Sequence, residues 1–227
     1  MKAIPLYIFM ILGLLINSCT MDNYNSPNSH FFGSVIDSGT NEPIPQDLIN
    51  GSQIEYTELG YENPIIQYLR FKTDGSFENK LMFAGTYEVK AVRGNFFDVP
   101  TSTIKISEET EYHFTTLPYI RINDVSITTN ADKSKVIATF KLQQVAENPV
   151  ASIVLFADRN SNVSNSIHTF SVQTSVNSIV DPQKVFTLEI GTNNMIKGKG
   201  YYFRIGALIS GISQAKHNYS IPVLLNL

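Results

Sequence analysis

Short runs of alternating apolar and polar residues, separated by turn residues, follow one another from residue 30 to the end of the chain. In the run 85–92, for example, Tyr87, Val89 and Ala91 fall on one face, opposite two charged residues. A period of two is the pattern of a β-strand with one buried face, whereas no segment of the first half carries a helical stripe of useful length. The pattern therefore predicts an all-β protein with strands near 31–36, 53–59, 65–72, 85–92, 103–106, 112–116, 125–129, 135–142, 151–157, 185–190, 201–209 and 220–225.

Turn residues divide these strands into two groups. The segment 73–76 reads Thr-Asp-Gly-Ser, and Asp-Gly favours a tight hairpin turn because both residues tolerate a positive φ. The segment 118–122 opens a second group, with a boundary near Leu117. Phe77 and Tyr87 are large enough to fill the space between two sheets. We therefore predict two consecutive β-sandwich domains, residues 30–117 and 118–227.

The first twenty residues have the form of a secretory signal. One basic residue precedes an apolar stretch at 3–16, which is too short for a comfortable transmembrane helix. An ordinary cleaved signal peptide with an incidental cysteine is one interpretation. However, the only cysteine of the chain ends this stretch, and Leu-Ile-Asn-Ser-Cys at 15–19 resembles a bacterial lipobox. That resemblance implies that residues 1–18 are removed and that Cys19 becomes a lipidated N-terminus.

A short tether at 19–29, rich in Asn, Ser and Pro, follows the cysteine. It contains Asp22, an acidic residue of the kind that directs some Bacteroidota lipoproteins to the outer face of the membrane. We therefore expect a protein that is lipid-anchored in the outer membrane and exposed on the cell surface.

Composition excludes several classes of function. The net charge of −3 leaves no broad basic surface for nucleic acid, and one cysteine excludes an internal disulfide or a thiolate zinc site. The segment 158–162 imitates the start of a calcium loop. The imitation fails because Val163 replaces the required glycine and Thr169 the bidentate glutamate. We expect no metal site and no cofactor.

Catalytic patterns are also missing from the sequence. There is no Gly-x-Ser-x-Gly elbow, and the densest acidic cluster, 108–111, is interpreted as a solvated turn between strands. The four histidines, at 30, 113, 168 and 217, have no motif around them and are interpreted as surface or packing residues. We expect no catalytic residues and no enzymatic activity.

Two loops place aromatic side chains beside amide or acidic groups, which is the chemistry that binds sugars. One loop contains Tyr61 and Asn63, and the other contains Asn95, Phe96 and Phe97. These five residues could form a carbohydrate platform if the fold brings the loops together. In the alternative interpretation, Phe96 and Phe97 pack under their loop and Tyr61 is merely exposed. The absence of tryptophan favours this alternative.

Each predicted domain resembles a known type of sandwich. Gly33-x-Val35-x-Asp37, with Asp-Gly-Ser-Phe at 74–77 and Gly-Thr-Tyr at 85–87, resembles the carboxypeptidase-regulatory-like, or prealbumin-like, fold. The segment 196–207 resembles strand F of a fibronectin type III domain. This second resemblance implies a tyrosine corner, in which a tyrosine hydroxyl bonds to a neighbouring loop. Tyr201 is the candidate, and Tyr202 is the alternative.

The order of these features, together with the Met-Asp-Asn-Tyr tether at 21–24, resembles a family of uncharacterised Bacteroidota lipoproteins. Members combine a prealbumin-like N-terminal domain with a fibronectin type III-like C-terminal domain, and are associated with starch-utilisation-type glycan uptake loci. The resemblance implies a surface protein that assists glycan capture, by weak carbohydrate binding or by docking on a transporter complex. The alternative is a structural or adhesive spacer that mediates protein–protein contacts.

Overall fold

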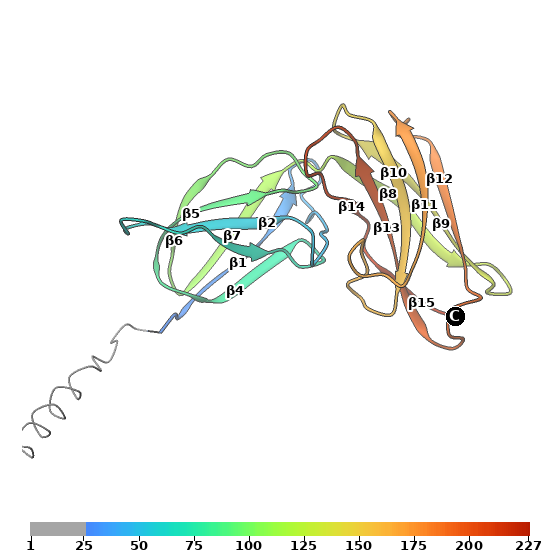
Figure 1. Ribbon diagram of the computed structural model, residues 1–227, viewed down its shortest axis with the longest axis horizontal. Coiled ribbons are helices and arrows are strands. Elements are labelled where there is room, and N and C mark those ends of the chain that lie inside the picture. Colours follow the sequence, from blue (N-terminus) through green and yellow to red (C-terminus); the bar gives the residue numbers. More distant parts are fainter. Residues whose placement is uncertain (1–25) are drawn as a thin grey trace, which may run out of the picture.

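The computed structural model describes residues 26–227, which form two β-sandwiches joined end to end (Figure 1). The predicted all-β fold is confirmed: this part of the chain contains fifteen strands, and no helix in it could cross a membrane. The first sandwich consists of β1 (Ser29–Asp37), β2 (Gln53–Glu58), β3 (Gln67–Arg70), β4 (Ser76–Met82), β5 (Gly85–Val92), β6 (Ser102–Ile106) and β7 (Glu109–Thr116). The second consists of β8 (Ile120–Thr129), β9 (Lys135–Gln144), β10 (Val150–Asp158), β11 (Phe170–Ser178), β12 (Val185–Gly191), β13 (Gly200–Ile209), β14 (Asn218–Tyr219) and β15 (Val223–Asn226).

In the first sandwich a three-stranded sheet, β4-β1-β7, packs on a four-stranded sheet, β3-β2-β5-β6. The central strand β1 runs antiparallel to β4 and parallel to β7. The close approach of β7 explains why β1 contains Gly33, because a Cβ atom there would lie 1.8 Å from the carbonyl oxygen of Tyr112. The glycine of the family pattern is therefore required by strand pairing.

Aromatic rings fill the space between the two sheets. Phe77 is buried at their centre, with ring centroids of Phe31 and Phe114 at 4.8 and 5.8 Å. Tyr87, also buried, donates a hydrogen bond from its hydroxyl to the carbonyl oxygen of Phe83 at 3.0 Å. The predicted core positions of Phe77 and Tyr87 are confirmed. A buried aromatic side chain contributes about 1.5–3 kcal/mol through removal of its apolar surface from water.

The turn at 73–76 forms, but it does not close a hairpin as the sequence predicted. The N–H of Lys72 donates to the carbonyl oxygen of Ser76, and Gly75 adopts a φ of 86°. However, β3 and β4 belong to different sheets. Phe71 is fully buried between them, so the chain crosses the core immediately before the turn. The predicted turn at 73–76 is therefore present. Burial of Phe71, however, places β3 and β4 in different sheets, so the two strands do not pair with each other.

In the second sandwich the sheet β12-β9-β8 packs on β11-β10-β13-β14, and β15 extends the pairing of β13. The hydroxyl of the buried Tyr201 accepts a hydrogen bond from the N–H of Ile196 at 3.1 Å. This is the predicted tyrosine corner, and it uses Tyr201. Tyr202 instead packs on a small cluster around Phe156 on the other face of the sheet.

Strand β11 was missing from the sequence prediction. It lies at the edge of its sheet and pairs only with β10 among the described strands, so most of its side chains are exposed. An edge strand has a neighbouring strand on one side only, and many of its side chains meet solvent. Its sequence therefore alternates weakly between apolar and polar residues. The alternation of Phe170, Val172 and Val176, which pack against the core, is the pattern that could have revealed it.

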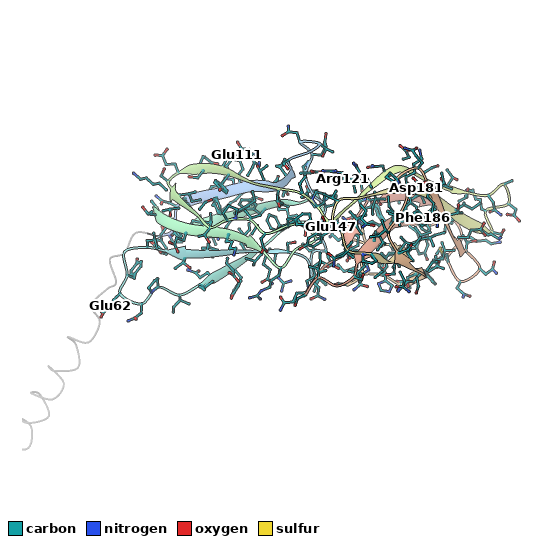
Figure 2. The ribbon with its side chains drawn as sticks, turned by 90° about the horizontal axis from the view of Figure 1, so that it is seen from above. Glu62, Glu111, Arg121, Glu147, Asp181 and Phe186 are labelled. Atoms are coloured by element: carbon teal, nitrogen blue, oxygen red, sulfur yellow. The ribbon has the colours of Figure 1, made fainter. Side chains whose placement is uncertain are left out.

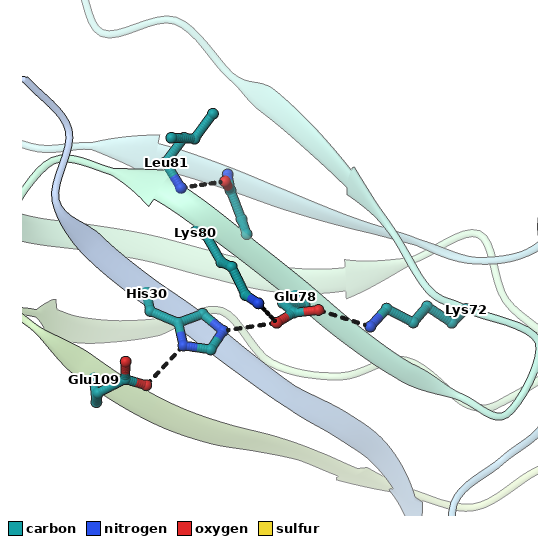
Figure 3. A network of polar contacts seen from close by, with 7 residues as sticks. His30, Lys72, Glu78, Lys80, Leu81 and Glu109 are labelled. Atoms are coloured by element: carbon teal, nitrogen blue, oxygen red, sulfur yellow. Dashed lines mark hydrogen bonds and ion pairs between the residues drawn. The ribbon is translucent and has the colours of Figure 1, made fainter.

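A polar network crosses the outer face of the β4-β1-β7 sheet (Figure 3). His30 on β1 lies 2.7 Å from Glu109 on β7 and 3.3 Å from Glu78 on β4. Hydrogen bonds from Lys72, and then from Lys80, hold the pKa of Glu78 at about 2. His30 thus links the three strands of the sheet, which agrees with its interpretation as a packing residue.

Candidate functional site

The two sandwiches meet at a polar junction built around Arg204 of β13. This side chain is fully buried, and its Nε donates to the carbonyl oxygen of Ser220 at 2.8 Å. Its two terminal nitrogens donate to the carbonyl oxygens of Gln46 and Thr73, both at 3.0 Å, which belong to the first sandwich. The guanidinium also lies 4.3 Å from the ring centroid of Tyr219. Arg204 therefore connects the second sandwich to two loops of the first.

Asp47 of the first sandwich complements this cation. Its Oδ2 accepts a hydrogen bond from the Ser166 N–H at 3.1 Å and from the Tyr219 hydroxyl at 3.3 Å. Burial acts to raise the pKa of Asp47, but the hydrogen bonds from Asn50, Ile49 and Ser166 together hold it below its ordinary value. Asp47 is therefore ionised at neutral pH and contributes charge to the junction.

Asn95, one of the predicted sugar-binding residues, is part of the same junction. Its side-chain amide is fully buried and donates to the carbonyl oxygens of Pro45 and His217, both at 3.0 Å. Its Oδ1 accepts a hydrogen bond from Gln46 at 2.8 Å. All of these groups are protein atoms, so Asn95 links the sandwiches and is not available to a ligand.

An ion pair closes the junction near the end of β1. Arg121 donates two hydrogen bonds to the carboxylate of Asp37, at 2.5 and 2.8 Å (Figure 2 labels Arg121). A cleft of about 380 Å³ lies beside this pair, and its lining combines proline and isoleucine side chains with polar groups such as those of Glu42 and Asp74. It lacks an exposed aromatic face.

A second cleft at the junction, of about 330 Å³, has the composition expected of a polar-ligand site. We refer to it as the junction cleft. Its polar lining residues come from both sandwiches, and the linker contributes Tyr119. The residues concerned are Glu55, Arg93, Asp98, Tyr119, Ser213 and Gln214.

Glu55 and Arg93 line one side of the junction cleft, and Tyr68 of β3 lies beside them on the outer face of the sheet. Glu55 on β2 is paired across the sheet with Tyr68 on β3, so both side chains point outward. Arg93, just after β5, donates to the Glu55 carboxylate at 3.2 Å, and its guanidinium carbon lies 5.7 Å from the ring centroid of Tyr68. The Tyr68 ring is 51% exposed. The cleft therefore presents a planar cation and a carboxylate, with an accessible aromatic ring next to the cation.

The backbone of the junction cleft is strained on both sides. Arg93 has a φ of 56° and Gln214 a φ of 58°, a left-handed conformation that is unfavourable for side chains of this kind. Each such residue costs about 1–2 kcal/mol, so the surrounding structure must hold it there. Strained residues gather at functional sites, and these two face the same cleft.

The predicted platform is not assembled as a single surface. Phe96 is only 3% exposed and packs beneath the junction cleft, so it cannot stack on a ligand. Phe97 is 39% exposed and contacts Tyr119 edge to face, with centroids 5.1 Å apart. The structure thus assigns Phe96 the packing role that the alternative interpretation gave it. Phe97 remains accessible beside the cleft.

The other predicted loop lies elsewhere. Tyr61 and Asn63 are exposed on the β2–β3 connection, at the end of the first sandwich away from the second (Figure 2 labels their neighbour Glu62). Because β2 begins at the junction and runs away from it, this loop cannot join the 95–97 loop in one site. The fold therefore does not meet the condition for a combined platform, which was that it bring the two loops together.

Sequence reasoning missed the residues that line the junction cleft. Glu55 and Tyr68 were assigned to strands without attention to their outward face, and Arg93 and Gln214 have no local motif. Their proximity depends on how two domains dock, which no local pattern reveals. The unusual sequence Arg-Gly-Asn at 93–95, directly after a strand, was the one available signal.

Other predicted features occupy structural positions. The acidic cluster 108–111 is not only a turn, because β7 begins at Glu109. His113 is exposed, whereas His168 and His217 pack against the ring of Phe156. Within residues 26–227, no three side chains of His, Cys, Asp or Glu gather in a group that could hold a metal ion.

The chain is thus a protein of two consecutive β-sandwich domains, with a polar cleft where the two domains meet. Two family models match the chain: the DUF3823 N-terminal domain over residues 29–116 and the DUF3823 C-terminal domain over residues 120–223. The chain belongs to the DUF3823 family. The expected membership of an uncharacterised Bacteroidota family is therefore confirmed. No curated protein matches the chain in sequence.

Solved structures support this assignment. A "putative carbohydrate binding protein" from Bacteroides uniformis is 28% identical and superposes with a TM-score of 0.79, covering 88% of this chain and all of its own. A DUF3823 family protein from Parabacteroides merdae is 20% identical, with a TM-score of 0.76, and covers 89% of this chain and all of its own. A second Bacteroides uniformis protein of the family, 17% identical with a TM-score of 0.77, covers 88% and 100%. The fold is thus common to all three.

Proposed function

We propose that this chain is a non-enzymatic, lipid-anchored protein of the outer cell surface that binds carbohydrate in the junction cleft. The observation that carries the proposal is the pair of Glu55 and Arg93 in the cleft lining, together with the exposed Tyr68 that Arg93 contacts at the edge of the cleft. A sugar ring presents an apolar face and a rim of hydroxyls. The face stacks on an aromatic ring, and the hydroxyls bond to carboxylate, guanidinium and amide groups. The similar Bacteroides uniformis protein is described as a "putative carbohydrate binding protein", which supports this proposal.

The size of the junction cleft limits what it binds. Its volume of about 330 Å³ lies at the lower end of the range of about 300–1,000 Å³ for small-ligand pockets. It fits a unit of one or two sugar rings rather than a long buried oligosaccharide. Affinity for one such unit is weak, which suits a protein that collects glycan segments and releases them to an uptake complex.

We expect Tyr68→Ala to weaken carbohydrate binding by about tenfold, because loss of a stacking ring costs roughly 1–1.5 kcal/mol. Arg93→Ala is expected to have an effect of similar size. The measurement is a glycan array with the wild-type chain, followed by titration of the variants with the best ligand. Tyr61→Ala is the matched control, since Tyr61 is also an exposed tyrosine and lies at the other end of the domain. An equal loss in Tyr61→Ala, or no binding to any glycan, would contradict the proposal.

The anchor is tested separately, because Cys19 lies outside the described residues. We expect cells expressing the chain to incorporate labelled palmitate into it, and the Cys19→Ala variant to lose the label completely. Three acyl chains, each CH₂ contributing about 0.8 kcal/mol, give durable attachment. Label retained in Cys19→Ala would refute lipidation at this residue. Protease treatment of intact cells would then report surface exposure.

A second candidate function is that of a structural spacer. It is favoured by the junction, where buried polar contacts of Arg204, Asp47 and Asn95 fix one sandwich against the other. A rigid two-domain rod holds a partner, such as a glycan transporter, at a set distance from the membrane. Absence of glycan binding, together with co-purification of a transporter complex, would favour this function over the first.

A further inference from the structure

The end of the first sandwich that lies away from the junction carries a group of exposed apolar side chains. Ile65 is 78% exposed and Leu81 is 72% exposed. Soluble proteins rarely leave several large apolar side chains together at one end without a binding role. We call this group the N-terminal pole, and its members are Tyr61, Ile65, Ile66, Leu81 and Phe83.

Strand directions bring these residues to one end of the molecule. The β2–β3 loop follows the end of β2, and the β4–β5 turn precedes the start of β5, which pairs with that end of β2. The N–H of Leu59 donates to Thr86 at 2.8 Å, and the carbonyl oxygen of Phe83 accepts from Tyr87. Both apolar loops therefore flank the start of β5, while the end of β5 leads to the junction.

The chain also enters the first sandwich at this pole. Ser29, the first residue of β1, is paired with Met82, the last residue of β4. The tether runs from Cys19 to Ser29, the first residue of β1, so ten peptide units separate these two residues. A fully extended chain spans at most about 3.6 Å per residue, so Cys19 lies within about 36 Å of the start of β1.

We propose that the N-terminal pole rests in the headgroup region of the membrane, with its apolar side chains inserted at the lipid interface. This inference rests on the lipid anchor of the proposed function, and it adds which surface of the protein faces the lipid. The short tether keeps the pole at a high effective concentration near the bilayer, so even a weak apolar contact is occupied. The exposed side chain of Lys80, near the end of β4, lies beside the pole, where its ammonium group can reach lipid phosphates.

The composition of the pole favours lipid over a protein partner. It combines one tyrosine, whose ring suits the boundary of water and hydrocarbon, with aliphatic residues and a phenylalanine on loop tips. Apolar side chains of this kind enter a lipid surface to a depth of about 5–10 Å, and they do not need a partner protein with a complementary surface. In this orientation the junction cleft, at the other end of the first sandwich, faces away from the membrane.

The test uses the full lipidated chain, in which Cys19 is the only cysteine and is blocked by its lipid. Ile65→Cys and Leu81→Cys are each labelled with an environment-sensitive fluorophore, and Glu147→Cys on the second sandwich is the control (Figure 2 labels Glu147). The proteins are mixed with phospholipid vesicles, and the vesicle-bound fraction is collected by flotation. Some vesicles contain lipids that carry a nitroxide quencher near the headgroup.

We expect the floated Ile65→Cys and Leu81→Cys proteins to show blue-shifted emission that the nitroxide lipids quench, whereas the control shows neither effect. Floated protein with unshifted, unquenched emission at both pole positions would overturn the inference while leaving the anchor intact. A blue shift without quenching would overturn it in favour of a second copy of the chain. Failure to float would overturn the anchor and this inference together.

Discussion

Replacing Arg204 with alanine is expected to lower the unfolding free energy by about 3–5 kcal/mol and to uncouple the two sandwiches. The reason is that the guanidinium satisfies carbonyl oxygens from both domains, which the variant leaves buried without donors. Removing one partner of a buried polar network costs about this much, because each orphaned group loses its hydrogen bond without regaining water. Burial lowers the pKa of Arg204 to about 10, so the side chain is still cationic at neutral pH.

Calorimetry provides the measurement for Arg204→Ala. The wild-type chain is expected to unfold in one transition, because the junction couples its domains, whereas the variant should show two separate transitions. Arg204→Met is a useful second variant: it keeps much of the side-chain volume but no donors, so it separates the loss of packing from the loss of hydrogen bonds. Arg159→Ala, which removes an exposed arginine and the same charge, is the control. One unchanged transition in Arg204→Ala would show that the junction does not depend on this residue.

Acid is expected to destabilise the protein by about 3 kcal/mol between pH 6.5 and pH 4, through His217. Burial lowers the pKa of His217 to about 4, although the charge of Asp47 acts in the opposite direction. Its ring packs against Phe156 and Tyr219, which keep the imidazole away from water. In this pH range the unfolded chain binds a proton that the folded chain does not, so stability falls by about 1.4 kcal/mol per pH unit.

The variant His217→Phe isolates this effect. It keeps an aromatic ring and cannot titrate, so its stability should fall much less than that of the wild type between pH 6.5 and 4. His113→Phe, the same change at an exposed histidine, should keep the wild-type pH dependence. The carboxylates of Asp37 and Asp47 have lowered pKa values, so the stability that they contribute begins to fall as pH approaches the unfolded-state value of 3.8, and it does so equally in the wild type and the variant. Parallel curves for wild type and His217→Phe would contradict the assignment.

The individual strands could be predicted from the sequence because each depends on a local pattern. The alternation of Tyr87, Val89 and Ala91 identifies β5, and the spacing before Tyr201 identifies the tyrosine corner. Strand pairing was less accessible. The turn at 73–76 predicted a hairpin, but burial of Phe71 sends the chain to the other sheet.

The candidate site was less predictable because it depends on docking. Arg204 and Gln46 are 158 residues apart in the sequence, and no local signal connects them. One clue was present: Arg204 is the only charged residue in the otherwise apolar strand 201–209, which indicates a buried cation with partners. Asn95 was a candidate sugar-binding residue because a side-chain amide can form hydrogen bonds with sugar hydroxyls. The same amide can form hydrogen bonds with backbone carbonyl oxygens, as it does here. The sequence does not distinguish these two uses.

The parallel pairing of β1 with β7 has a mechanical consequence. The chain enters β1 at Ser29, at the N-terminal pole, and leaves β7 at Thr116, at the junction. A pull between the tether and the second sandwich therefore draws two neighbouring strands in opposite directions along their length. The hydrogen bonds between β1 and β7, which span the eight paired positions from His30 to Asp37, are then loaded in shear. They resist the pull together instead of breaking one after another. Such a pull loads the first sandwich in the direction in which the hydrogen bonds between β1 and β7 resist together.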